Sequence, residues 1–194
     1  MTEKGINALK KLLETLVYPG YSFKRFTFKS SINGYITIDV LLEPIFPLPK
    51  GRNIHSYNKR IFNDFYSLDG KIGEYMEYLE EMDPTLANDE DEYWKKSDEI
   101  CGDLEVDIGY DSEDSLILTG YIIVRKYRVK GTNKIYTEEI PFLPKGSKYT
   151  DTFKYIIAST CGSEYGGIIE AYNFLKSKGL KISKSEFYRI IKNS

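Results

Sequence analysis

The last 25 residues hold the side chains best suited to contact nucleic acid. Six basic and two acidic residues lie between Glu170 and Ser194, a local balance of +4. Lysine and arginine neutralise phosphates, and serine and tyrosine hydroxyls donate hydrogen bonds to phosphates or base edges. These residue types predict binding rather than a reaction. The alternative is a helical hairpin that packs on the rest of the protein with its lysines in water.

Two short amphipathic helices are expected to position this cluster. Apolar residues recur at helical spacing over 168–175 and again over 182–191, with a turn around Gly179 between them. Ser183 and Glu186 have the spacing of a capping box, in which the serine oxygen accepts a hydrogen bond from the backbone N–H three residues on. The second helix is therefore expected to begin at Ser183.

Residues 168–192 resemble the helix-turn-helix segments of small DNA-binding proteins. The likeness rests on Ile-Ser-Lys-Ser at 182–185, followed by an aromatic residue and by Tyr-Arg at 188–189. The turn is several residues longer than in the compact motif, and 153–159 would have to supply the first supporting helix. The resemblance implies DNA contact in the major groove by Lys184, Ser185, Tyr188 and Arg189, and on phosphates by Lys178 and Lys181.

Residues able to carry catalysis are sparse. His55 is the only histidine and lies in a polar, basic stretch, where a surface histidine is the favoured interpretation. Cys101 and Cys161 are isolated, and the chain has no GxSxG, GxxxxGK[ST] or GxGxxG segment. We therefore expect no catalytic residue, no cofactor and no metal. An enzyme of unfamiliar type is the third functional alternative.

The stretch 83–114 is strongly acidic and is expected to form a solvated loop. Its densest part, 88–92, lacks the spaced oxygen ligands and central glycine of a calcium loop. The opposed charges of this stretch and the C-terminus also suggest a hypothesis. The acidic segment could shield the basic helices, as a mimic of DNA, until a partner displaces it.

Two LeuProLysGly segments, at 48–51 and 143–146, are predicted to be stiff surface loops. Each follows a strand-like segment that begins Gly-Tyr-Ile, which raises the possibility of a duplicated unit of strand, loop and helix. Stiff loops of this kind suit contacts with other proteins. The residues expected to make such contacts are Leu48, Pro49, Lys50, Leu143, Pro144 and Lys145.

The overall pattern predicts an α+β fold, with an antiparallel sheet or meander flanked by helices and a helical C-terminal hairpin. Helices are expected over 4–17, 57–66 and 72–82. Strands are expected over 34–42, 104–108, 116–129 and 134–142, with turns at 33–34 and 131–133. The predicted division is a core domain of residues 1–148 and a helical subdomain of residues 149–194.

Composition limits the function classes. The chain of 194 residues is 41% hydrophobic and 29% charged with a formal charge of −2, and no apolar run reaches membrane length or forms a signal peptide. Abundant Lys, Ile, Tyr and Asn with scarce Ala and Arg indicate an AT-rich genome, such as that of a phage or a low-GC bacterium. We expect a phage or mobile element and a cytoplasmic location. The favoured function is a non-enzymatic binding or structural protein that acts through other proteins or self-association. A small DNA-binding regulator is the alternative.

Overall fold

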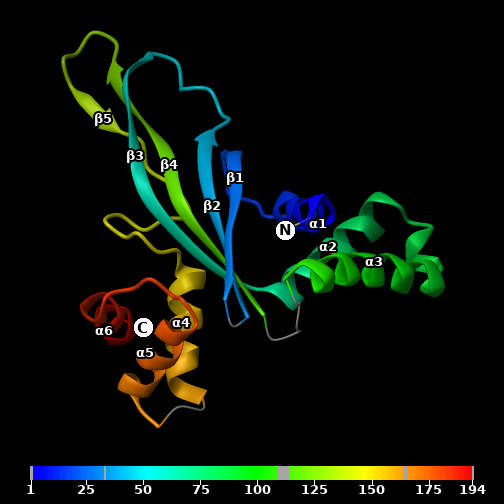
Figure 1. The fold of residues 1–194 in the computed structure, drawn as a ribbon. Helices are drawn as coiled ribbons and strands as arrows, with labels where there is room; N and C mark the ends of the chain where they lie inside the picture. The colour runs from blue at the N-terminus through cyan, green and yellow to red at the C-terminus, as the bar shows by residue number, and fades with distance from the viewer. Residues whose placement is uncertain (1, 33, 109–113, 164–165, 194) are drawn as a thin grey trace.

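The computed structural model describes residues 2–32, 34–108, 114–163 and 166–193, and its fold is α+β (Figure 1). Within these ranges six α-helices accompany a five-stranded sheet. The strands are β1 (Tyr21–Ile32), β2 (Tyr35–Pro44), β3 (Arg52–Ser67), β4 (Ser115–Val129) and β5 (Ile135–Thr137). The helices are α1 (Glu3–Glu14), α2 (Leu68–Met82), α3 (Glu90–Ile108), α4 (Asp151–Ser163), α5 (Ile168–Ser177) and α6 (Lys184–Lys192), with a 3-10 turn at Leu86–Asn88.

The sheet is mixed, with the order β1-β2-β4-β3 and with β5 paired to β4. β1 and β2 form an antiparallel hairpin, β4 and β3 form a longer one, and the central β2–β4 pair is parallel. The antiparallel meander expected from the sequence is therefore wrong at its centre. The 47 residues between β3 and β4 include α2 and α3, and this connection returns the chain beside β2.

Each sheet face packs against its own set of helices. Alternate residues of β2 and β4 point to one face and are buried with apolar residues of α1, α2 and α3. On the other face, Phe65 and Ile117 pack with Phe153, Leu175 and Phe187 from the C-terminal helices. Helices therefore cover both faces at one end of the sheet. The other end, formed by β3, β4 and β5, extends beyond them (Figure 1).

Several predicted elements are confirmed. The N-terminal helix forms with Thr2 as its N-cap, and its apolar side chains fill the larger core. The strand over 34–42 is β2, the strand over 116–129 is β4, and the helix over 72–82 lies within α2. The turn at 131–133 connects β4 to β5, although only Ile135–Thr137 of the predicted strand 134–142 pairs back. Asn33 of the first predicted turn lies outside the described residues.

Two predicted elements are wrong. Residues 57–66, expected to be helical, belong to β3, which pairs with β4 from Arg52 to Ser67. Residues 104–108, expected to be a strand, end α3, and most of the acidic stretch is helical rather than a loop. The duplicated unit also fails, because the first LeuProLysGly segment is followed by a strand and the second by a helix.

A buried carboxylate joins β3 to distant parts of the chain. The side chain of Asp64 is 1% exposed and accepts hydrogen bonds from the hydroxyls of Tyr18, Tyr66 and Thr150 and from the backbone N–H of Phe65. Burial, and then the charge of Asp64, raises the pKa of both tyrosines above the ordinary value. The cluster connects the start of β1, the edge strand β3 and the start of α4.

In the part of the chain that the structure describes, no helix is both long enough and apolar enough to cross a bilayer.

Candidate functional site

The C-terminal helices form where the sequence predicts them, and α4 supplies the third helix. α6 buries Phe187 and Ile190 against α4 and α5. The Ser183 hydroxyl accepts a hydrogen bond from the backbone N–H of Glu186 and donates one to the Glu186 carboxylate. The Glu186 carboxylate also accepts hydrogen bonds from Lys148 and from the backbone N–H of Ser183, so both halves of the capping box are confirmed.

The residues that the resemblance assigns to DNA lie on α6 and in the turn before it. The turn runs from Lys178 to Ser183. Lys181 in this turn is exposed, whereas Lys178 is half-buried and its ammonium lies 5.4 Å from the centre of the Phe174 ring. The residues on the outer side of α6 are Lys184, Ser185 and Arg189, which are exposed, and Tyr188, which is half-buried.

The two LeuProLysGly loops lie in different surroundings. Pro49 and Lys50 are exposed and Leu48 is half-buried at the connection between β2 and β3. In the second loop Lys145 is exposed and Pro144 is half-buried, but Leu143 is 2% exposed and belongs to the larger core. Leu143 therefore offers no surface to a partner in this structure.

The extended end of the sheet has an unusual composition. Residues 50–60 and 121–137, which we call the basic ribbon, hold nine Lys or Arg residues and no Asp or Glu. Four tyrosines lie in the same segments. These segments comprise parts of β3 and β4, all of β5 and the adjoining turn residues, and the pairing of the three strands brings the segments together. The nine basic residues are Lys50, Arg52, Lys59, Arg60, Arg125, Lys126, Arg128, Lys130 and Lys134.

Most of these cations have no anionic partner within the protein. Among the residues that the structure describes, Arg125 alone of the nine forms an ion pair, with Glu138. The Arg60 guanidinium donates to the carbonyls of Pro144 and Ser147. The other seven leave their charge available to a ligand.

Tyrosine rings lie beside the cations of the ribbon. The Arg52 guanidinium carbon lies 4.8 Å from the centre of the Tyr127 ring, and that ring stacks on Tyr136 at 5.7 Å. The Lys59 ammonium lies 5.9 Å from the centre of the Tyr121 ring. Such pairs place a flat apolar surface next to a positive charge, which is the combination that nucleotides require.

One face of the β3–β4 pair is left uncovered by helices. The register places Lys59 opposite Ile123 and Ile61 opposite Tyr121, and Tyr57 lies two residues from Lys59 on the same side. This is the side that α4, α5 and α6 cover further along the strands, at Phe65 and Ile117. Tyr57, Ile61 and Tyr121 are 58%, 44% and 45% exposed. We call these five residues the open face.

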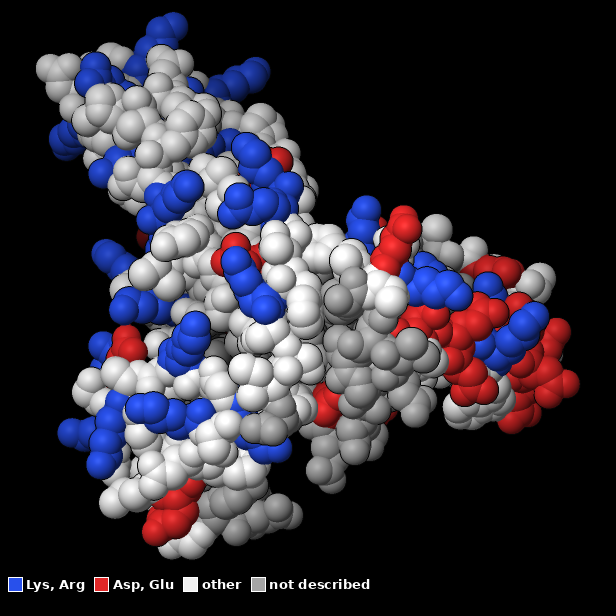
Figure 2. Space-filling view, in the orientation of Figure 1, with Lys and Arg blue, Asp and Glu red and all other residues white. Residues whose placement is uncertain are grey.

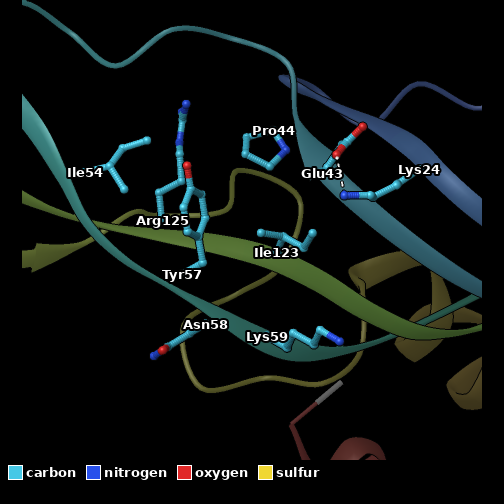
Figure 3. Close-up of a pocket in the computed structure, with 9 residues that line it drawn as sticks. All are labelled: Lys24, Glu43, Pro44, Ile54, Tyr57, Asn58, Lys59, Ile123 and Arg125. Carbon is cyan, nitrogen blue, oxygen red and sulfur yellow. Dashed lines mark ion pairs between the residues drawn. The ribbon is translucent and has the colours of Figure 1, made fainter.

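A pocket opens where β2 separates from β4. The last β2–β4 pair is Leu42 with Ile122, after which β4 continues without β2. The pocket, of about 480 Å³, lies at this fork (Figure 3). Tyr57 stands beside Arg125 on one side, and Lys24, paired with Glu43 at 3.5 Å, lies on the other. The lining residues are Lys24, Glu43, Pro44, Ile54, Tyr57, Asn58, Lys59, Ile123 and Arg125.

Arg125 is a structural member of this fork pocket. Its guanidinium is 7% exposed, donates to both carboxylate oxygens of Glu138 and to the carbonyl of Phe46, and lies over the Phe46 ring. The hydrogen bonds that Arg125 donates to Glu138 raise the pKa of Arg125, while burial and then the charge of Glu138 raise the pKa of Tyr21 to about 12. These contacts hold the wall of the pocket in place.

Acidic residues gather on the opposite side of the molecule. Residues 68–108, which form α2 and α3, hold 15 acidic and three basic residues, a balance of −12. Figure 2 shows Asp and Glu over these helices, and Lys and Arg over the ribbon and the C-terminal helices. α3 packs on α1 and α2, on the other face of the sheet from α6. The described acidic residues therefore do not cover the basic C-terminal helices, and the shielding hypothesis receives no support.

The candidate catalytic residues lie on different elements of the fold. His55 is exposed on β3, in the basic ribbon. Cys101 and Cys161 are unpaired cysteines on α3 and α4. The described residues contain no group of three His, Cys, Asp or Glu side chains placed to hold a metal ion.

The ribbon and the fork pocket were not predicted from the sequence. Tyr57 and Lys59 fall in a stretch that was expected to be helical, so their place beside β4 was not foreseen. A usable signal was nevertheless present, because residues 121–137 combine five basic residues and three tyrosines with no acidic residue.

Comparisons with known proteins give no relative: no family model, no curated protein and no solved structure matches the chain.

Proposed function

We propose that this chain is a non-enzymatic nucleic-acid-binding protein, and that the basic ribbon and the open face form its binding surface. The observation that carries the proposal is the composition of the ribbon, with nine cations and four tyrosines and no carboxylate. Basic side chains bind phosphates by releasing counterions, and this attraction is strongest where no acidic group opposes it. The acidic α2 and α3 lie on the other side of the sheet and orient the ligand toward the ribbon.

Single-stranded nucleic acid fits this surface better than a duplex does. Tyr57 and Tyr121 expose their rings on a sheet face, and an aromatic ring can stack only on a base that is unpaired. The fork pocket beside Tyr57 has apolar walls from Ile54 and Ile123 and includes two lysines, Lys24 and Lys59, which suits a base with its phosphate at the rim. A duplex would use the cations alone.

The experiment that tests this proposal compares one sequence in two forms. Fluorescence anisotropy with a labelled 20-nucleotide strand and with its duplex is measured for the wild-type chain and for Tyr57→Ala/Tyr121→Ala. Stacking contributes roughly 1–3 kcal/mol per base, so we expect the double variant to lose about tenfold or more in single-strand affinity and little in duplex affinity. Tyr78→Ala, at a comparably exposed tyrosine on acidic α2, is the matched control.

Each outcome of the anisotropy experiment has a different consequence for the proposal. Absence of saturable binding to either form at low salt would refute the proposed function. Equal affinity for strand and duplex, with no effect of the double tyrosine variant, would retain nucleic-acid binding but refute the single-strand preference. In that case the helix-turn-helix interpretation gains weight, with Lys184, Ser185, Tyr188 and Arg189 in the major groove and Lys178 and Lys181 on phosphates. Lys184→Gln/Arg189→Gln would then lower duplex affinity.

A second candidate is the protein-binding or structural role expected from the sequence. The observation that favours it is a set of large exposed side chains on the acidic helices: Tyr78 at 45%, Met82 at 68% and Trp94 at 56%. Apolar groups within an acidic surface suit a basic partner protein. Multi-angle light scattering of the purified chain, with Trp94→Ala/Met82→Ala as the comparison, tests whether this surface causes self-association. The amino-acid composition still favours an AT-rich source such as a phage or mobile element. We propose the cytoplasm as the site of action.

A further inference from the structure

A small pocket lies between the second LeuProLysGly loop and the C-terminal helices, away from the open face. It has a volume of about 230 Å³. The loop leading into α4 forms one wall, Lys154 in the first turn of α4 forms another, and the end of α6 closes the third. The lining residues are Pro144, Lys145, Gly146, Ser147, Tyr149, Lys154, Arg189, Ile190 and Asn193.

The charge of this pocket is of one sign. Lys145, Lys154 and Arg189 line it, and no acidic residue does, whereas the fork pocket includes Glu43. Neither Lys145 nor Arg189 forms an ion pair with a described residue. Lys154 lies 3.5 Å from the Asp151 carboxylate, whose side chain is 85% exposed, so that pair is weak. Of the three positive groups in the pocket, only Lys154 therefore has a counterion within the described part of the protein, and that carboxylate is exposed.

The neighbouring carboxylate does not cancel this charge. Glu186, one turn before Ile190 on α6, is already bound by Lys148 at 3.3 Å and by the Ser183 hydroxyl at 3.0 Å. The carboxyl end of α6 adds a negative partial charge at the same rim. The attraction for an anion must then come from the three basic side chains, which makes it sensitive to their substitution.

The wall that carries Lys145 is held rigidly. The Arg60 guanidinium donates to the carbonyls of Pro144 and Ser147, and the backbone N–H of Asn63 donates to the carbonyl of Lys148 at 2.8 Å. The Ser147 hydroxyl donates to the carbonyl of Tyr149. A loop fixed in this way at both ends loses little entropy when a ligand binds.

We propose that this pocket binds a phosphoryl group, held by Lys145, Lys154 and Arg189. Arginine offers a planar pair of donors that matches two phosphate oxygens, and the lysines add compact positive charges. The volume is below the range of pockets that enclose a whole drug-sized ligand, so the phosphoryl group enters and its substituent stays outside. The phosphoryl group comes either from a nucleic-acid strand or from a small phosphate monoester. This proposal goes beyond nucleic-acid binding and does not depend on it, because binding of inorganic phosphate alone tests it.

The test is a titration of the full chain with inorganic phosphate, followed by the amide signals of Gly146 and Ser147 and the side-chain N–H signal of Arg189 in ¹H–¹⁵N spectra. We expect saturable shifts confined to this pocket. Lys145→Gln/Arg189→Gln should weaken phosphate binding at least about tenfold, since it removes two of the three charges. Both residues are exposed, so the variant is expected to fold, which circular dichroism verifies.

The matched control is Lys10→Gln/Lys11→Gln, which removes the same charge from exposed positions on α1, on the other face of the sheet from the C-terminal helices. It should change phosphate affinity less than about twofold. Non-saturable shifts in the wild type, or equal losses in the pocket and control variants, would overturn the proposal, because either result indicates a diffuse surface field.

A second arm identifies the source of the phosphoryl group. If a 5′-phosphate strengthens oligonucleotide binding by the wild type and not by the pocket variant, the site holds a strand end. If the pocket variant weakens binding with and without the 5′-phosphate, and more than the control does, it holds an internal phosphate. If inorganic phosphate binds and oligonucleotide affinity is equal in all variants, the ligand is a small monoester.

Discussion

Replacing the buried carboxylate of Asp64 tests the most concentrated polar contact in the fold. In Asp64→Ala the hydroxyls of Tyr18, Tyr66 and Thr150 and the N–H of Phe65 all lose their acceptor. The site is 1% exposed, so water has little access to replace the lost bonds. The perturbation therefore leaves several buried donors without partners at once.

The expected magnitude follows from these four bonds. A hydrogen bond to a charged acceptor contributes roughly 1.5–3 kcal/mol net, so independent losses would reach at least about 6 kcal/mol. The losses are not independent, because the Tyr18 and Tyr66 hydroxyls lie 2.9 Å apart and can bond to each other. We therefore expect a decrease of about 4 kcal/mol in the free energy of unfolding, a large part of the 5–15 kcal/mol typical of a domain.

Urea unfolding followed by circular dichroism measures this decrease. Thr150→Val, which removes one of the four bonds and a cap of α4, is expected to lose about 1–2 kcal/mol. Asp39→Ala, whose ion pair with Arg25 is long at 3.8 Å and largely exposed, should lose less than about 1 kcal/mol. A loss below about 1 kcal/mol for Asp64→Ala, with an unchanged dependence on urea, would refute the reasoning.

Three further predictions concern stability. Gly120→Ala should lower the free energy of unfolding in urea by at least about 2 kcal/mol, because a Cβ there would lie 1.9 Å from the carbonyl oxygen of Val40 in β2 and the backbone φ is +147°. A stability equal to wild type would contradict this close approach. Arg125→Met should lose about 3 kcal/mol by leaving the Glu138 carboxylate, 8% exposed, without its cation, and a loss under about 1 kcal/mol would argue against the buried pair. Burial first raises the pKa of Tyr21 and of Tyr149 to about 12, above the value of about 10 in the unfolded chain. The folded state thus holds these protons more tightly, so the stability they contribute is complete below pH 10 and falls between pH 10 and 12, by about 1–3 kcal/mol for each tyrosine. Stability that stays constant over that interval would contradict both shifts.

The parts of the fold that the sequence predicts are those in which local signals agree. In α1 the apolar positions recur at helical spacing and Thr2 caps the first turn, so spacing and cap give the same answer. From Tyr35 to Leu42, β2 alternates between half-buried and buried residues. α6 combines a Ser183 cap with apolar residues at Phe187 and Ile190. Each of these elements can be recognised from fewer than 15 neighbouring residues.

The errors come from contacts between distant segments. In 57–66 the spacing of Tyr57, Ile61 and Phe65 fits a helix, but pairing with β4 over the whole length of β3 decides for a strand. In 104–108 the alternation of Leu104, Val106 and Ile108 suggests a strand, yet the segment continues α3, which buries Leu104 one turn after Ile100. The order of strands in the sheet is likewise set by tertiary packing.

The candidate functional surface was predicted only in part, because some of it also depends on contacts between distant segments. The C-terminal candidates lie on a recognisable helix, so Lys184 and Arg189 could be placed on its outer side. The open face requires the register of β3 against β4, which brings Lys59 and Ile61 beside Tyr121 across about 60 residues of sequence. No local pattern specifies that register. Net charge was also uninformative, because −12 on residues 68–108 hides the positive charge elsewhere.

The most direct test of nucleic-acid binding by the ribbon is the salt dependence of single-strand affinity. Each phosphate contact contributes about 0.7 to the slope of log affinity against log salt, so Arg52→Gln/Arg128→Gln should lower that slope by about 1.4. Lys10→Gln/Lys11→Gln, with the same loss of charge on α1 and the other face of the sheet, should leave the slope unchanged. A reduced slope in the ribbon variant alone is the result that the account predicts. The same slope in wild type and both variants, or no binding by the wild type at low salt, would contradict it.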